Sequence, residues 1–284
     1  MILRTRFAPS PTGPLHLGHA FSAIKAFELA RQSRGQFLLR IEDIDQSRAR
    51  VHWETQIFSD LTWLGLTWEE PVLRQSEQQA RYDAALDRLW ADGLLYPCDC
   101  KRRDIQAALS APQEGVALGP DGIIYPGTCR QNPRPKQRPA DVNLRLDMAA
   151  ATANMNELTF TEHSFGTNCP RNIKVNPKEL CATVGDVVLS RRDMATSYHL
   201  SVVLDDAMQG ITDVVRGEDL FDATQIHIVL QSIMGLETPQ YHHHRLVRDE
   251  AGKRLAKRDD ARSISLYRTE GLSLADIRTR VGLD

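Results

Sequence analysis

The sequence predicts an α/β fold with a doubly wound parallel sheet, and three adjacent segments near its beginning carry this prediction. An apolar-rich run that ends at Ala8 indicates a short strand. Apolar residues recur at helical spacing from His16 to Ser33, and Gln36–Ile41 has the composition of a buried strand. Strand, helix and strand in this order imply a parallel pair with a right-handed crossover, and ligands of such sheets bind at the carboxyl ends of the strands.

The connection between the first strand and the first helix has the composition of a phosphate-binding turn. Three prolines and a glycine within residues 9–14 predict a stiff turn, and the helix N-terminus after it offers unpaired N–H groups. His16 and His19 lie three residues apart, on one face of the first helical turn, and Gly18 lets a ligand approach the backbone. A surface pair of histidines or half of a metal site would show the same spacing, so these alternatives stay open on spacing alone.

The rest of the chain continues with further helices and strands. Apolar periodicity predicts a helix around residues 53–64, and Ser76 with Gln79 forms a capping-box pattern before a helix that ends near Gly93. The aromatic residues of that helix are expected in the core. The later elements that we expect are strands at 141–146, 185–190, 211–216 and 241–247, and helices at 198–206, from 216 onward, at 265–269 and at 274–281.

Three carboxylates follow the second predicted strand. Glu42, Asp43 and Asp45 stand within four residues, and a solvated turn would explain them. Their position beside the strand that carries Arg6 favours a binding site instead. The sequence contains no GxGxxG pattern, so it does not suggest dinucleotide binding.

Composition limits the class of protein. The chain has 284 residues, 42% hydrophobic and 25% charged, and a formal net charge of -2, which is typical of a soluble globular protein. We find no apolar run of membrane-spanning length and no signal-peptide layout, so we expect a cytoplasmic protein without a membrane partner. Any RNA binding would depend on local basic patches, because the whole chain is not a polycation.

The cysteines favour a metal site over disulfides. Five cysteines in an expected cytoplasmic chain argue for metal ligands or free thiols. Cys98, Cys100 and Cys129 flank a segment rich in proline and glycine that lacks regular structure, and zinc would bind such a set with one further ligand. Three reduced thiols are the alternative. We expect Cys169 and Cys181 to be free thiols.

Two stretches far apart in the sequence resemble the paired signatures of class I aminoacyl-tRNA synthetases. His16-Leu-Gly-His19 resembles the HIGH motif, and the segment from Lys253 to Lys257 resembles the mobile lysine loop, with Ala256 where the family often has serine. The strings at 6–13 and 40–45 are more specific and resemble the glutamyl-tRNA synthetase branch. The resemblance covers most of residues 4–146 and 185–262, and leaves 149–181 unmatched.

The cysteine pattern resembles that of a shortened group within this family, the glutamyl-queuosine tRNA(Asp) synthetases. Their zinc site has the form Cys-x-Cys…Tyr-x-x-x-Cys, which implies one structural Zn²⁺ bound by Cys98, Cys100, Tyr125 and Cys129. The resemblance implies a class I catalytic domain of the HIGH type with a zinc-bearing insertion and a short helical tail. Because few residues follow Lys257, we expect no anticodon-binding domain.

The resemblance also implies a reaction. L-Glutamate would be activated with ATP to glutamyl adenylate without tRNA, and then transferred to the queuosine base in the anticodon loop of tRNA(Asp), with Mg²⁺ accompanying ATP. Two carboxylates and an ammonium on glutamate need arginines and an acid. The resemblance assigns catalysis to His16, His19, Lys253 and Lys257, ATP binding to His16, Gly18, His19 and Lys257, and glutamate binding to Arg6, Ser10, Glu42, Tyr198 and Arg216.

We expect a monomer whose catalytic domain is divided into 1–96 and 185–250. Residues 97–184 would form the zinc-bearing insertion, and 251–284 the lysine loop and helical tail. One alternative is a truncated glutamyl-tRNA synthetase that charges the tRNA 3′ end, against which the short tail counts. A non-catalytic, synthetase-like RNA-binding module is a second alternative, and a HIGH-type nucleotidyltransferase making a small molecule is a third. The intact signatures argue against the second, and the strings at 6–13 and 40–45 argue against the third.

Overall fold

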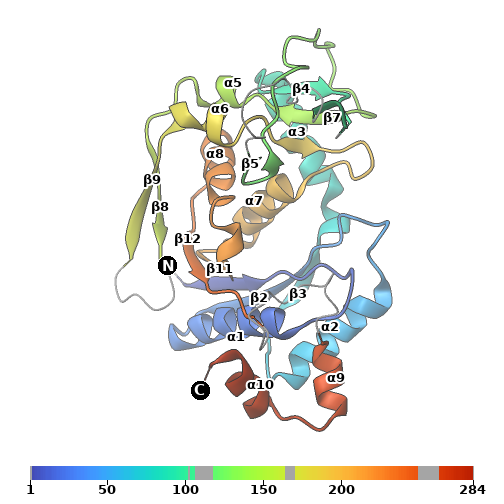
Figure 1. Ribbon diagram of the computed structural model, residues 1–284, viewed down its shortest axis with the longest axis vertical. Helices are drawn as coiled ribbons and strands as arrows, with labels where there is room; N and C mark the ends of the chain where they lie inside the picture. The colour runs from blue at the N-terminus through green and yellow to red at the C-terminus, as the bar shows by residue number, and fades with distance from the viewer. Residues whose placement is uncertain (1, 102, 106–117, 164–169, 249–261, 284) are drawn as a thin grey trace.

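The computed structural model describes residues 2–101, 103–105, 118–163, 170–248 and 262–283. Its centre is a sheet in which β1 pairs with β2, β2 with β3, and β11 with β12, all in parallel (Figure 1). The two groups meet where the Thr212 amide donates to the Arg4 carbonyl at 3.0 Å. In spatial order the strands are β3 (Glu69–Arg74), β2 (Gln36–Ile41), β1 (Arg4–Phe7), β11 (Asp213–Gly217) and β12 (Gln240–His244).

Helices cover both faces of this sheet, which confirms the predicted doubly wound α/β class. In Figure 1, α1 (Leu17–Gln32) lies on one face, and α7 (Tyr198–Gln209) and α8 (Thr224–Met234) lie on the other. The face of α1 is apolar because its buried residues recur at helical spacing, including Ala20, Phe21 and Ile24. The tail helices α9 (Ile264–Thr269) and α10 (Leu274–Val281) pack beside α2 (Val51–Trp63) and α1.

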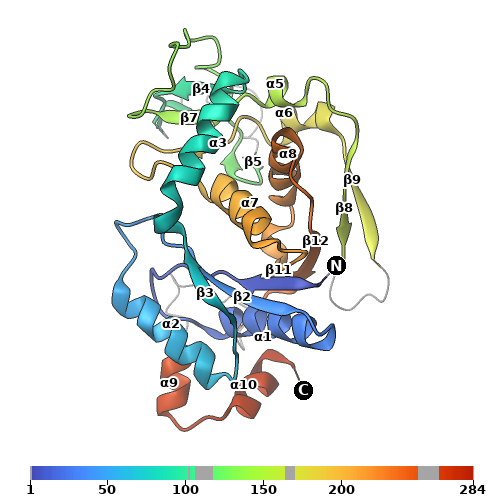
Figure 2. The same ribbon diagram turned by 180° about the vertical axis from the view of Figure 1, so that it is seen from behind.

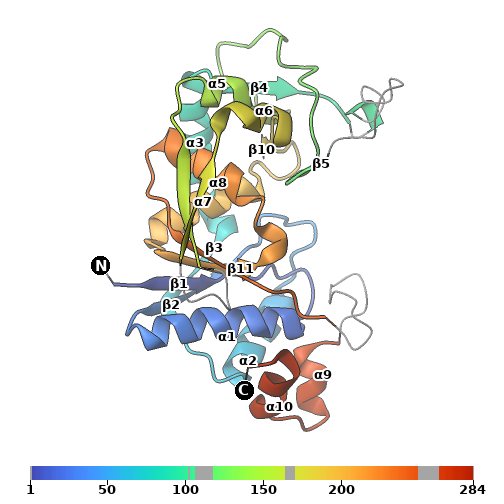
Figure 3. The same ribbon diagram turned by 60° about the vertical axis from the view of Figure 1, so that its left-hand side comes forward.

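A second layer of structure stands beyond α7 and α8. Figure 2 shows α3 (Gln79–Ala91) leading from the central sheet to an antiparallel sheet in the order β10-β7-β4. Figure 3 shows the antiparallel pair of β8 and β9, which reaches the central sheet where Glu162 of β8 pairs with Tyr241 of β12. The remaining elements are β4 (Leu95–Cys98), β5 (Leu118–Gly119), β6 (Gly122–Ile123), β7 (Asn143–Leu146), α5 (Met148–Thr152), β8 (Leu158–Glu162), β9 (Arg171–Val175), α6 (Leu180–Thr183), β10 (Val188–Ser190) and the 3₁₀ turns η1 (Gln75–Gln78), η2 (Pro177–Glu179) and η3 (Glu218–Leu220).

Most expected elements are present, but one expected cap and the start of one helix differ, and several strands, among them β4, β8 and β9, were not expected from the sequence. The predicted capping box at Ser76 is wrong, because the Ser76 amide and hydroxyl donate to the Asp43 carboxylate at 2.8 and 2.6 Å. Gln78 occupies the N-cap position of α3, without a capping hydrogen bond from its side chain. The helix expected from residue 216 begins at Thr224, after η3. The sequence analysis also missed β3, whose first three residues, Glu69-Glu70-Pro71, are exposed and poor in strand-forming types. The domain boundaries stay a prediction.

Among the described residues, no helix is long and apolar enough to cross a membrane.

Candidate active site

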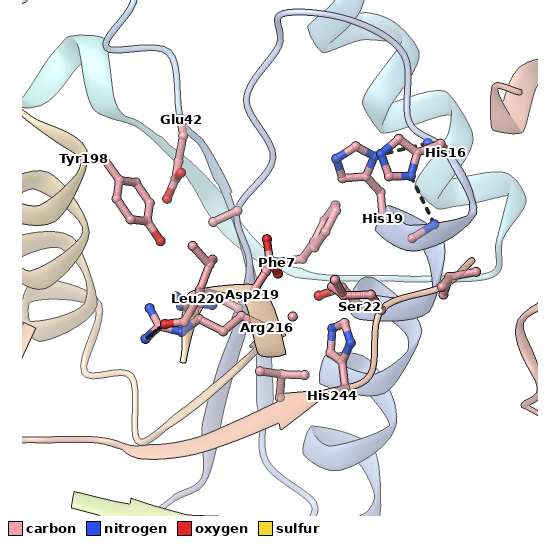
Figure 4. A pocket seen from close by; sticks show the side chains of 17 residues that line it. Phe7, His16, His19, Ser22, Glu42, Tyr198, Arg216, Asp219, Leu220 and His244 are labelled. Carbon is pink, nitrogen blue, oxygen red and sulfur yellow. Dashed lines mark hydrogen bonds between the residues drawn. The ribbon is translucent and has the colours of Figure 1, made fainter. Parts of the chain in front are cut away.

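A cavity of about 570 Å³ opens at the carboxyl ends of β1, β2, β11 and β12 (Figure 4). The order of the strands reverses between β1 and β11, and this switch point is where open α/β sheets bind their ligands. Glu42, Tyr198 and Arg216 lie on one side of the cavity, and His16 and His19 lie on the other. The cavity therefore has an end with ionisable groups of both signs and an end formed by a helix N-terminus.

The two histidines cap α1 reciprocally. His16 Nδ1 accepts the Gly18 amide at 3.1 Å, and His19 Nδ1 accepts the His16 amide at 3.1 Å. Histidines here take the places that serine and glutamate occupy in a usual capping box. Because both Nδ1 atoms accept, each neutral ring carries its proton on Nε2. Their ring centroids are 3.8 Å apart, so the two imidazoles form one compact unit on the cavity wall.

Gly18 lets the capping ring lie close to the backbone. A Cβ at this position would lie 3.0 Å from His16 Cε1. Gly18 also lines the cavity, so its backbone is accessible at the first turn of α1. Glycine therefore serves both the close ring contact and the open approach to the helix N-terminus.

Arg6 is held in a buried ionic network. Its guanidinium forms two hydrogen bonds with the Asp206 carboxylate, at 2.9 and 3.3 Å. Arg40 also binds Asp206, at 2.7 Å, and contacts Glu42 Oε1 at 3.2 Å. Burial alone would raise the pKa of Asp206, but the nearby Arg6 and Arg40 hold it below its ordinary value of 3.8. Asp206 therefore stays ionised and offsets part of the arginine charge.

Glu42 has the opposite electrostatic balance. Burial raises its pKa above the ordinary value of 4.5, although Arg40 and Arg6 act to lower it. Tyr198 faces Glu42 from the first turn of α7, which Ser197 caps. Burial also raises the pKa of the Tyr198 phenol, so it is a neutral donor at physiological pH. A cationic ligand group beside Glu42 would favour its ionised form.

The Arg216 guanidinium donates to neutral groups. Its Nε donates to His243 Nε2 at 3.0 Å and its Nη2 to Thr224 Oγ1 at 2.7 Å, and both acceptors are neutral. Within the described parts of the chain, no carboxylate forms an ion pair with this guanidinium, although only 5% of the residue is exposed. A buried charge that the protein leaves uncompensated favours an anion in the adjoining cavity.

Ser10 lines a neighbouring cavity of about 390 Å³ that shares Glu42, Tyr198 and Leu220 with the first. The structure thus brings seven of the expected residues to one cavity, Arg6, His16, Gly18, His19, Glu42, Tyr198 and Arg216, with Ser10 next to it. Lys253 and Lys257 lie outside the described residues. Asp206 and the buried histidines around Arg216 were not expected from the sequence. Ionisable residues within otherwise apolar helices and strands were the one feature that could have indicated them.

The expected metal ligands meet at the end of β4. The sulfur atoms of Cys98, Cys100 and Cys129 all lie within 4.8 Å of one another. The Tyr125 hydroxyl is 3.4 Å from the sulfurs of Cys98 and Cys100, so it stands at the same point. The three cysteine sulfurs are donors that zinc prefers, and with the phenol they make up the four ligands of a tetrahedral site. Burial raises the pKa of the Cys100 thiol to about 11, so a bound cation would have to displace its proton.

The remaining cysteines lie apart from this cluster. Cys181 is an exposed free thiol, as expected. Cys169 lies outside the described residues.

Known proteins resemble this chain in sequence. Residues 2–282 match the family described as class I tRNA synthetases (E and Q), catalytic domain. A glutamyl-Q tRNA(Asp) synthetase of Rhodobacter capsulatus is 59% identical over 284 residues, covering 98% of this chain and 99% of the relative. Another of Albidiferax ferrireducens is 40% identical, covering 97% of this chain and 90% of the relative.

Solved structures agree on the fold. A glutamate tRNA ligase from Elizabethkingia meningosepticum, in complex with its amino acid, gives a TM-score of 0.70 at 26% identity. The match covers 96% of this chain and 54% of that chain, so this protein spans about half the length of the solved ligase. A methionyl-tRNA synthetase from Mycobacterium tuberculosis gives a TM-score of 0.62 at 12% identity over 99% of this chain and 64% of its own, a likeness of fold alone.

Proposed function

Because this chain belongs to the glutamyl-Q tRNA(Asp) synthetases, a group of ligases within the class I tRNA synthetases, we propose that it activates L-glutamate with ATP. The product would be glutamyl adenylate, formed without tRNA, and glutamate would then pass to the queuosine base in the anticodon loop of tRNA(Asp). The observation that carries this proposal is that one cavity has two different ends. Glu42 and Arg216 lie at one end, and the N-terminus of α1 lies at the other.

We assign the end of the cavity that holds Glu42, Tyr198 and Arg216 to glutamate. Arg216 has a positive charge that is not paired with a carboxylate in the part of the chain that the structure describes, which suits the side-chain carboxylate. Glu42 suits the ammonium, whose charge would offset the cost of ionising this buried acid. The Tyr198 hydroxyl donates, and Arg6 and Ser10 complete the proposed set near the α-carboxylate end.

The opposite end of the cavity suits ATP. The α1 N-terminus directs its dipole at a bound phosphate, and Gly18 leaves its backbone accessible. We propose that His16 and His19 donate from Nε2 to phosphate oxygens, and that Lys253 and Lys257 bring positive charge from the other side. Attack of the glutamate carboxylate on the α-phosphate needs charge stabilisation and positioning, without a covalent enzyme nucleophile. Mg²⁺ bound with ATP would neutralise part of the phosphate charge.

We propose that Cys98, Cys100, Tyr125 and Cys129 bind one structural zinc ion. Measured metal content should show zinc in the purified chain, and chelation should lower its thermal stability. Cys100→Ser should reduce both the zinc content and the melting temperature. Unchanged stability after complete removal of the metal would contradict a structural role.

Acceptor specificity tests the second half of the reaction. Radiolabelled glutamate and ATP should transfer label to tRNA(Asp) that contains queuosine, and not to the same tRNA isolated from cells unable to make queuosine. Removal of the 3′-terminal nucleotide from the tRNA before the reaction distinguishes the two possible acceptors, because it abolishes labelling at the 3′ end and leaves the queuosine diol intact. Label at the 3′ end would instead support a truncated glutamyl-tRNA synthetase.

The oligomeric state and the localisation need separate experiments. We propose a monomer in the cytoplasm, which light scattering and cell fractionation would examine.

A further inference from the structure

Arg216 stands at the junction of two hydrogen-bonded chains of buried side chains. The first arm consists of His243 and Glu162. The second arm consists of His227, His199 and Asp121. Glu162, His243 and His227 line neither cavity, whereas His199 and Asp121 line the neighbouring cavity that also holds Ser10. The binding roles proposed above assign no task to any of these five residues.

The first arm has a fixed direction. Arg216 Nε donates to His243 Nε2 at 3.0 Å, and a guanidinium has no lone pair to accept with, so this Nε2 carries no proton. The proton of the neutral ring is therefore on Nδ1, which donates to Glu162 Oε2 at 2.6 Å. Burial lowers the pKa of His243, in keeping with a neutral ring. Glu162 is fully buried and also accepts the His243 amide at 3.1 Å, so the carboxylate is fixed by two bonds.

The second arm follows the same rule over two rings. The other edge of the Arg216 guanidinium, at Nη1, is 3.1 Å from His227 Nδ1, which must accept. His227 Nε2 then donates to His199 Nδ1 at 3.2 Å, and His199 Nε2 donates to Asp121 Oδ1 at 3.3 Å. Burial, followed by the charge of Arg216, holds the pKa of His227 well below its usual range. Every proton in both arms is therefore directed away from Arg216.

The imidazoles of His243 and His227 hold Arg216 in place without bringing a carboxylate into contact with it. A carboxylate placed directly against Arg216 would hold it firmly, but would also neutralise the charge that a substrate anion needs. A neutral imidazole accepts from the guanidinium and moves the carboxylate one ring farther away. Arg216 is thus fixed on two edges, at Nε and Nη1, while its charge stays available. This arrangement resembles the way outer hydrogen bonds orient a metal-ligating histidine.

We propose that Glu162, His243, His227, His199 and Asp121 are positioning residues that fix the Arg216 guanidinium for the side-chain carboxylate of the amino acid substrate. This inference rests on the proposed function, in which Arg216 binds that carboxylate. It adds that the turn between β5 and β6, which carries Asp121 only four residues before the expected zinc ligand Tyr125, takes part in amino acid specificity.

Substitutions in the first arm test the proposal most strongly. His243→Leu removes the acceptor of Arg216 Nε, and we expect the KM for glutamate to rise roughly tenfold while the KM for ATP stays unchanged. His243→Gln should recover much of this loss, because its amide oxygen reaches the place of Nε2. His163→Leu is the matched control, since this histidine adjoins Glu162 in the sequence but contacts Gln240.

Asp121→Ala tests the second arm without disturbing the core, because the Asp121 side chain is 49% exposed. We expect an increase of about threefold in the KM for glutamate, with the KM for ATP and the melting temperature unchanged. Calorimetric titration of the full chain with glutamate should show the same change in affinity, independently of turnover.

Two results would overturn the inference. One is a glutamate affinity equal to that of the wild type in a folded His243→Leu protein. If that variant does not fold, the same result in Asp121→Ala would count against the inference. The other is a parallel increase in the constants for glutamate and ATP, which would indicate a purely structural role. If Arg216→Ala itself leaves glutamate binding unchanged, the proposed function fails, and not only this inference.

Discussion

Two arginines at the glutamate end of the cavity are held in opposite ways. Arg6 is paired with Asp206, which Arg40 also binds, so its charge is offset within the protein. Arg216 contacts neutral histidine, threonine and backbone acceptors. Both guanidinium groups are buried and fixed, but among the described residues that of Arg216 has no carboxylate in direct contact, which leaves more of its charge for an added anion. The position of a carboxylate, and not the number of hydrogen bonds, thus separates an arginine whose charge is offset within the protein from one that is held by neutral groups.

Removing Arg216 should have the largest effect on binding. In Arg216→Ala the glutamate side-chain carboxylate would enter a buried site without its partner, so we expect the affinity for glutamate to fall roughly 100-fold. The melting temperature should fall less than in a variant that leaves a charge unpaired, because the acceptors left behind, His243 Nε2 and Thr224 Oγ1, are neutral. Calorimetric titration with glutamate and thermal unfolding measure the two effects separately. Comparable affinity in wild type and variant would remove the distinction between the two arginines.

Removing the partner of Arg6 should instead affect stability. Asp206→Asn takes away the charge that faces both Arg6 and Arg40, and we expect the free energy of unfolding to fall by about 3 kcal/mol. Denaturant unfolding measures this change, with Asp92→Asn as a control at an exposed carboxylate. An unchanged midpoint would mean that the Arg6 charge does not need Asp206.

The raised pKa of Glu42 should appear in the pH dependence of glutamate binding. If the ionised form binds the ammonium, the affinity is complete above the raised pKa and falls as the pH drops through it, beginning above the ordinary carboxyl value of 4.5. Glu42→Gln should weaken binding roughly tenfold at neutral pH and flatten this dependence. A profile for Glu42→Gln that matches the wild type would assign the titration to another group.

Gly18→Ala should have the smallest effect on substrate binding. This effect should concern ATP, at the other end of the cavity. The added Cβ would lie 3.0 Å from His16 Cε1, so the capping ring must shift by a few tenths of an ångström. We expect a rise of about threefold in the KM for ATP and no change for glutamate. Ala23, which is buried on the same helix away from the cavity, offers Ala23→Gly as a control for helix stability. An effect on glutamate instead of ATP would reverse the assignment of the two ends.

The local patterns of the sequence predicted the parts that depend on neighbouring residues. Proline content and helical spacing placed the β1–α1 turn and the capping histidines, because both are decided within a few residues. The same reasoning failed at Ser76, where a tertiary hydrogen bond to Asp43 replaced the expected cap. A local pattern competes with distant partners that the sequence does not show.

The polar network around Arg216 could not be predicted from the sequence, because its members are distant from one another in the chain. Glu162, Arg216 and His243 come from β8, β11 and β12, which are far apart in the chain and meet only through the order and register of the strands. Resemblance to a known family supplied Tyr198 and Arg216 as site residues, but not the groups that hold them. Spacing alone could not have shown that two histidines separate Arg216 from a carboxylate.

Glutamate-dependent exchange of pyrophosphate into ATP, with no RNA present, tests the central claim most directly. The account predicts exchange by the wild-type chain and its loss in Arg216→Ala at glutamate concentrations that saturate the wild type. Exchange that requires added tRNA would contradict activation by the cavity alone and favour a truncated glutamyl-tRNA synthetase. No exchange with or without tRNA would contradict the catalytic function itself.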